Sequence, residues 1–79
     1  MWQLDYTREA RNYFLDNDPY SFSLLIKIEE LKFTLDGIPV EGCTQIEDGL
    51  LWWETLSHAV IYARLPAENR LVISAIKPI

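Results

Sequence analysis

The stretch LLWWETLSHAVIYARL, residues 50–65, decides the fold that this sequence predicts. Two runs rich in β-branched and aromatic residues, 50–55 and 58–65, are separated by a very short break, which is typical of an antiparallel β-hairpin. A third such run, 70–77, follows the turn-like residues PAEN at 66–69. Together the three runs predict an antiparallel meander.

The N-terminal half predicts one more strand and two helices. Apolar and polar residues alternate over 2–6, as in a short strand, and Thr7 is a suitable N-cap for a helix over 8–16. The Asp-Pro pair at 18–19 favours a new helix start, because Asp caps well and proline is tolerated in the first turn. Apolar residues at helical spacing then predict a second helix over about 20–34.

Residues 37–49, GIPVEGCTQIEDG, show neither the helical spacing nor the strand alternation of apolar residues, so they predict a surface loop. The expected order of elements is therefore β-α-α-β-β-β. This order predicts an α+β fold, a two-layer sandwich in which two N-terminal helices pack on one face of a small, mainly antiparallel sheet. Because 79 residues supply material for only one hydrophobic core, residues 1–79 are expected to form a single domain.

Composition narrows the classes of partner. With 49% hydrophobic residues the chain should fold, and no stretch approaches the roughly 20 apolar residues that a bilayer requires. We expect no membrane partner and, since no leader-like segment follows Met1, a cytoplasmic protein. The lone Cys43 cannot form an internal disulfide. Twelve acidic against seven basic residues give a net charge of −5, which disfavours RNA or the ribosome as a partner.

Four segments resemble the RelE/ParE toxin superfamily of bacterial type II toxin–antitoxin modules. They are LDYTREARNYF at 4–14, LLIKIEEL at 24–31, GLLWWETLSHAVIYAR at 49–64 and NRLVISAIK at 69–77. The resemblance implies the fold described above. It also implies a small antitoxin partner of the Phd/YefM or RelB kind, which would lay a helix or an added strand against the chain.

The same resemblance argues against the usual activity of RelE-type members. Their ribosome-dependent cleavage of messenger RNA uses basic residues on the open face of the sheet, where Lys and Arg stabilise the charge that develops on the phosphate. The positions expected to be basic are occupied here by Trp52, Glu54 and Ala59, and Lys77 is followed by Pro78. The resemblance therefore implies a toxin-like scaffold whose cleavage activity is degenerate or absent.

Three basic residues remain as weak catalytic candidates: Arg64, Arg70 and Lys77. Arg64 and Arg70 flank the last predicted hairpin, so they could approach one another. One interpretation is ordinary surface pairing with the excess acids. The other is a residual basic site that contacts RNA or the acidic tail of an antitoxin.

Other chemistries have weaker support in the sequence. His58 follows Ser57 on a predicted strand, where neighbouring side chains diverge, so we expect a structural histidine and not the base of a nucleophile. Cys43 lacks an adjacent basic residue that would activate its thiol. Glu41 and Glu47 have no His or Cys cluster beside them, so neither a metal ion nor any other cofactor is expected.

The adjacent Trp52 and Trp53 should point to opposite faces of the sheet. In the register of the family, Trp53 belongs to the core beneath the helices. The partner-binding surface predicted on the open face consists of Leu50, Trp52, Glu54, Ala59 and Ile61. Exposed apolar patches usually mark interfaces, so two functions stay open. One is a weakly active ribosome-associated endoribonuclease, and the other is a catalytically empty module that binds an antitoxin-like protein or a second copy of itself.

Overall fold

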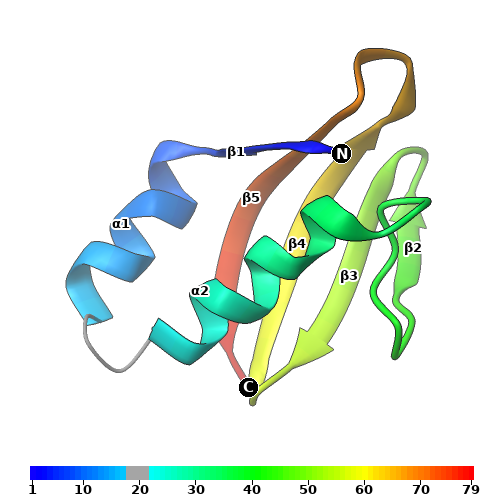
Figure 1. Cartoon of the computed structure of the whole chain (residues 1–79). Helices are drawn as coiled ribbons and strands as arrows, with labels where there is room; N and C mark the ends of the chain where they lie inside the picture. Colours follow the sequence, from blue (N-terminus) through cyan, green and yellow to red (C-terminus); the bar gives the residue numbers. More distant parts are fainter. Residues whose placement is uncertain (18–21) are drawn as a thin grey trace.

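The computed structural model describes residues 1–17 and 22–79 and has two layers, with the helices on one side of a sheet (Figure 1). No helix within these ranges is long and apolar enough to cross a membrane. In chain order the elements are β1 (Gln3–Tyr6), α1 (Arg8–Asn17), α2 (Phe22–Glu29), the 3₁₀ turn η1 (Glu30–Phe33), β2 (Thr44–Glu47), β3 (Leu50–Thr55), β4 (His58–Leu65), the 3₁₀ turn η2 (Pro66–Glu68) and β5 (Arg70–Pro78).

The sheet has five strands in the order β1-β5-β4-β3-β2. Strands β3, β4 and β5 form the predicted antiparallel meander, and β1 pairs with β5 in parallel. The prediction of a loop throughout 37–49 was wrong for Thr44–Glu47, which form the edge strand β2 against β3. Every residue of β2 is exposed, so neither face of this strand is covered and its sequence needs no alternation of apolar and polar residues. The strand forms because its backbone pairs with β3.

The first helix begins as predicted. The Thr7 side-chain oxygen accepts a hydrogen bond from the Ala10 amide at 3.3 Å, which makes Thr7 the N-cap. The same hydroxyl donates to the carbonyl oxygen of Ser74 on β5 at 2.7 Å. A β-bulge shifts the β4–β5 register at this point, so one residue both caps α1 and attaches it to the irregular part of the sheet.

The second predicted helix is α-helical over Phe22–Glu29 and continues as the 3₁₀ turn over Glu30–Phe33. Its expected start at 18–19 lies outside the described residues. Tyr6 donates from its hydroxyl to Glu29 at 2.5 Å, which joins β1 to α2. Burial raises the pKa of Glu29, but hydrogen bonds from Lys32 and Tyr6 outweigh it and leave the pKa of this carboxyl below its ordinary value.

The core lies between the helices and the inner face of the sheet. Its largest fully buried side chains are Trp53, Tyr62, Leu24, Ile28, Leu31, Leu71, Ile73 and Val60. Trp53 is 1% exposed and donates from its indole N–H to Glu41 at 3.0 Å. Tyr62 meets Trp53 edge to face, with ring centroids 6.5 Å apart, and donates to the Gly37 carbonyl at 2.7 Å. The prediction that Trp53 belongs to the core is confirmed.

Candidate functional site

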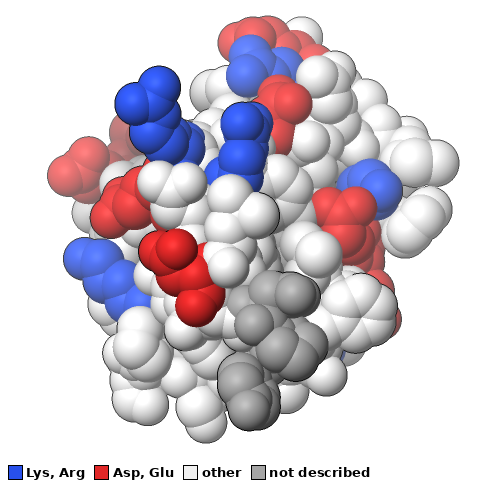
Figure 2. Space-filling view, turned by 90° about the vertical axis from the view of Figure 1, so that its left-hand side faces the viewer, with Lys and Arg blue, Asp and Glu red and all other residues white. Residues whose placement is uncertain are grey.

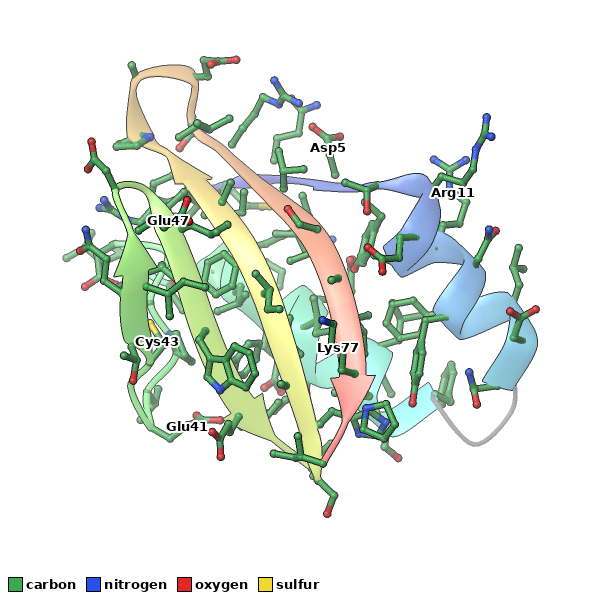
Figure 3. The ribbon with its side chains drawn as sticks, turned by 180° about the vertical axis from the view of Figure 1, so that it is seen from behind. Asp5, Arg11, Glu41, Cys43, Glu47 and Lys77 are labelled. Carbon is green, nitrogen blue, oxygen red and sulfur yellow. The ribbon has the colours of Figure 1, made fainter. Side chains whose placement is uncertain are left out.

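The open face of the sheet, opposite the helices, is seen directly in Figure 3. Its centre carries two cross-strand rows, Trp52–Ile61–Ala75 and Leu50–Ala63–Val72. Both rows are apolar, and their members are half-buried or buried through packing on one another. These two rows at the centre of the face therefore present an apolar surface without a basic side chain.

A third row, Glu54–Ala59–Lys77, crosses the same strands nearer to one end of the sheet. Glu54 is exposed and accepts a hydrogen bond from the Trp52 indole at 2.9 Å, so the carboxylate and the ring are held together. Lys77 is exposed and points outward (Figure 3). Ala59 is 0% exposed and forms the floor between them. Of the five residues predicted to contact a partner, four are therefore partly or fully exposed on this face: Leu50, Trp52, Glu54 and Ile61.

Arg70 also belongs to the open face, but its charge is compensated. Its Nε lies 2.8 Å from Asp5 Oδ2 and its Nη1 lies 2.9 Å from Glu68 Oε1. The hydrogen bond from Arg70 holds the pKa of the Asp5 carboxyl below its ordinary value, and Asp5 in turn raises the pKa of Arg70. Two carboxylates therefore compete with any phosphate for this guanidinium.

Arg64 lies on the other face of the sheet, opposite Leu71, which belongs to the core. Its guanidinium carbon is 5.5 Å from the centroid of the Trp2 ring, and its Nε donates to the Asp36 carbonyl at 2.5 Å. Arg64 and Arg70 therefore do not come together. The bulge in β5 places Arg70 and Lys77 on one face although they are seven positions apart, an odd offset that would put them on opposite faces of a regular strand, and Arg64 faces the other way.

The most exposed apolar side chains of the helical layer were missed by sequence reasoning. Leu15 is 71% exposed, Phe22 60%, Ile26 49% and Phe33 71%. The sequence signal was present, because the segment 22–35 is apolar on more than one side. Only the packed structure shows which side remains uncovered.

His58 contacts α1 and not Ser57. Its Nδ1 lies 2.7 Å from the Leu56 carbonyl, which can only accept, so Nδ1 carries the proton and Nε2 accepts from the Tyr13 hydroxyl. This connection attaches α1 to the β3–β4 turn and agrees with the expected structural role of His58. Cys43 lies with its sulfur 3.9 Å from the Tyr62 hydroxyl.

Charge is mixed elsewhere on the surface. Figure 2, which shows the end of the molecule that carries α1, has basic and acidic side chains interspersed without a continuous basic patch. Across the part of the chain that the structure describes, no three His, Cys, Asp or Glu side chains gather as metal ligands would.

Comparison with known proteins identifies similar folds but no related sequence. No protein-family model and no curated protein matches the sequence. Among solved structures, the isolated E. coli RelE toxin superimposes with a TM-score of 0.72 at 10% identity, over 99% of this chain and 84% of that chain. A chain of the intact E. coli RelBE toxin–antitoxin complex superimposes with a TM-score of 0.69 at 11% identity, over 100% of this chain and 98% of that chain. The protein therefore has a RelE-like fold, as the sequence resemblance implied.

Proposed function

We propose that this protein is a toxin-like component of a toxin–antitoxin module that acts by binding protein, with RNA cleavage degenerate or absent. The observation that carries the proposal is the chemistry of the open face on a RelE-like fold. Trp52 and Glu54 stand where the resembling family carries basic residues, and the neighbouring rows are apolar.

The case against RNA cleavage is electrostatic. Of the seven basic residues in the chain, only Arg70 and Lys77 belong to the open face, and Arg70 is engaged by two carboxylates. Removal of one group that stabilises the transition state typically costs about 10²- to 10³-fold in rate. Glu54 adds a negative charge that would repel a phosphate.

The case for protein binding rests on the same rows. Leu50, Trp52 and Ile61 offer apolar area to a partner, Ala59 gives a flat floor, and Glu54 supplies a charge at the margin. The structure of the E. coli RelBE complex is that of a toxin with its antitoxin. By analogy, the partner of this chain is a small antitoxin-like protein, and a second copy of the chain is the competing occupant.

The test has two arms. The purified chain is incubated with ribosomes and a reporter message, and it is separately co-expressed with the product of an adjacent reading frame. We expect no cleavage at ordinary enzyme ratios and a stable complex with the neighbouring protein. Efficient cleavage would refute the proposal that RNA cleavage is degenerate or absent. A monomer that does not arrest growth and does not bind the product of the adjacent reading frame would refute the proposed binding role.

Variants locate the surface. Trp52→Ala should weaken the complex while the circular dichroism spectrum stays unchanged, because this side chain lies on the open face. Phe33→Ala is the matched control, since it removes an exposed aromatic ring from the helical layer. If both variants weakened the complex equally, the open face would not be the specific contact surface.

A weak endoribonuclease is the second candidate, and the position of Lys77 favours it. Its ammonium is exposed on the open face and makes no ion pair with any residue in 1–17 or 22–79. If cleavage is observed, Lys77→Ala should abolish it. Arg64→Ala should leave it unchanged, because Arg64 is on the far side of the sheet.

A further inference from the structure

A hollow of about 260 Å³ opens beside the β2–β3 turn, on the side of the sheet away from the open face. Its apolar walls come from Ile38, Leu51 and Pro66. Its polar lining includes the side chains of Gln45, Asp48 and Arg64. The hollow is wide enough for one side chain of a partner, and its chemistry depends on how Arg64 is held.

Arg64 is fixed in place before any ligand arrives. The Trp2 ring lies against its guanidinium, 5.5 Å from centroid to Cζ, and Nε donates to the Asp36 carbonyl at 2.5 Å. Trp2 is itself anchored, since its indole N–H donates to the Thr34 carbonyl at 3.1 Å. A guanidinium held by a ring face and one backbone oxygen loses little further freedom when it binds a ligand.

The remaining donors of Arg64 are unused. No Asp or Glu oxygen among residues 1–17 and 22–79 lies within 4.0 Å of its nitrogens, and its two Nη groups have no hydrogen-bond partner in those ranges. By contrast, Arg70 on the neighbouring strand β5 forms ion pairs with two carboxylates. In an acidic chain of net charge −5, Arg64 thus lines a hollow with no ion pair to its guanidinium among the described residues, although Asp48 lines the same hollow.

We propose that this hollow binds a carboxylate side chain, supplied by the protein partner proposed above. Two Nη groups on one edge of a guanidinium match the two oxygens of a carboxylate. The apolar walls accept the methylene groups that precede it. Asp48, which also lines the hollow, disfavours a ligand of higher charge, which selects a carboxylate over a phosphate. The source of the ligand rests on the proposed function, whereas the site itself does not.

The experiment is an NMR titration of the full chain labelled with ¹⁵N. Butyrate, which carries the carboxylate and methylene groups of a glutamate side chain, is added at constant ionic strength. Inorganic phosphate is added in a parallel series. We expect saturable shifts of the Arg64 Nε–H and the Gln45 side-chain amide with butyrate. The Arg70 Nε–H is the internal control and should show no saturable shift, because its carboxylate partners are already present.

Two variants make the assignment falsifiable. Arg64→Gln should abolish saturation at Gln45. Asp48→Asn, an exposed substitution that should leave the fold intact, should lower the butyrate dissociation constant by about 2- to 5-fold through loss of a like charge. Linear shifts at both arginines, or no change in Asp48→Asn, would overturn the site. Tighter binding of phosphate than of butyrate would overturn the choice of ligand.

The two proposals fail separately. If butyrate does not bind while Trp52→Ala still weakens the partner complex, the carboxylate site is wrong and the protein-binding function stands. If butyrate binds as expected and no partner is found, the site stands and its protein source is wrong.

Discussion

The two adjacent tryptophans provide a matched test of the register on which the open face depends. Trp53 is 1% exposed in the core, and Trp52 is half-buried on the open face. A slip of one residue in β3 would exchange their environments. Comparing Trp53→Ala with Trp52→Ala therefore separates the observed register from its alternative, with the same change of side chain at neighbouring positions.

The expected magnitudes differ severalfold. Replacement of a buried Trp by Ala typically costs about 3–5 kcal/mol of unfolding free energy, and Trp53→Ala also removes the 3.0 Å hydrogen bond to Glu41. A domain of this kind has only about 5–15 kcal/mol in total, so this variant should lose a large share of its stability and unfold at a much lower urea concentration. Trp52→Ala loses a partly covered ring and should cost about 1 kcal/mol.

Urea unfolding followed by circular dichroism measures both variants without relying on tryptophan fluorescence. Trp53→Phe is the intermediate control, because it retains most of the buried ring volume and loses the indole donor. Its cost should fall between those of the two alanine variants. Equal costs for the two alanine variants, or a larger cost at Trp52, would refute the register and the account of the open face built on it.

Three further results are expected. Leu56 and Ser57 have φ values of 49° and 61°, so replacing the pair by Asn-Gly should relieve left-handed strain and raise the free energy of unfolding by about 1 kcal/mol; an unchanged urea midpoint would contradict this. The lowered pKa of Glu29 contributes stability that is present above its unfolded value near 4.5 and is lost as pH falls through the folded value. Glu29→Gln should therefore reduce the difference between urea midpoints at neutral and acid pH, and an unaltered difference would contradict the assignment. Glu54→Lys should increase affinity for a labelled single-stranded RNA and steepen its dependence on log salt by about 0.7 per phosphate contacted, as measured by fluorescence anisotropy; no change would show that RNA does not reach this face.

Sequence reasoning predicted which residues of β3 share the open face. The alternation in β3 places Trp52 and Glu54 opposite Trp53 because the period of a strand is fixed by its backbone. It did not separate Arg64 from Arg70, since that depends on the β4–β5 register, which pairs Arg70 with Leu65 and Arg64 with Leu71. Nor could it find the hollow beside Arg64, whose lining comes from four separate segments of the chain.

The sequence by itself determined the elements whose signals are local. The alternating runs at 50–55 and 58–65 and the cap at Thr7 fix strands and a helix start through contacts between near neighbours. The tertiary structure alone decided that Thr44–Glu47 pair as an edge strand and that the charge of Arg70 is compensated while that of Arg64 is not. An exposed edge strand has no buried side to impose alternation on its residues, and an ion pair such as that of Arg70 with Asp5 joins residues far apart in the sequence, so neither leaves a local pattern.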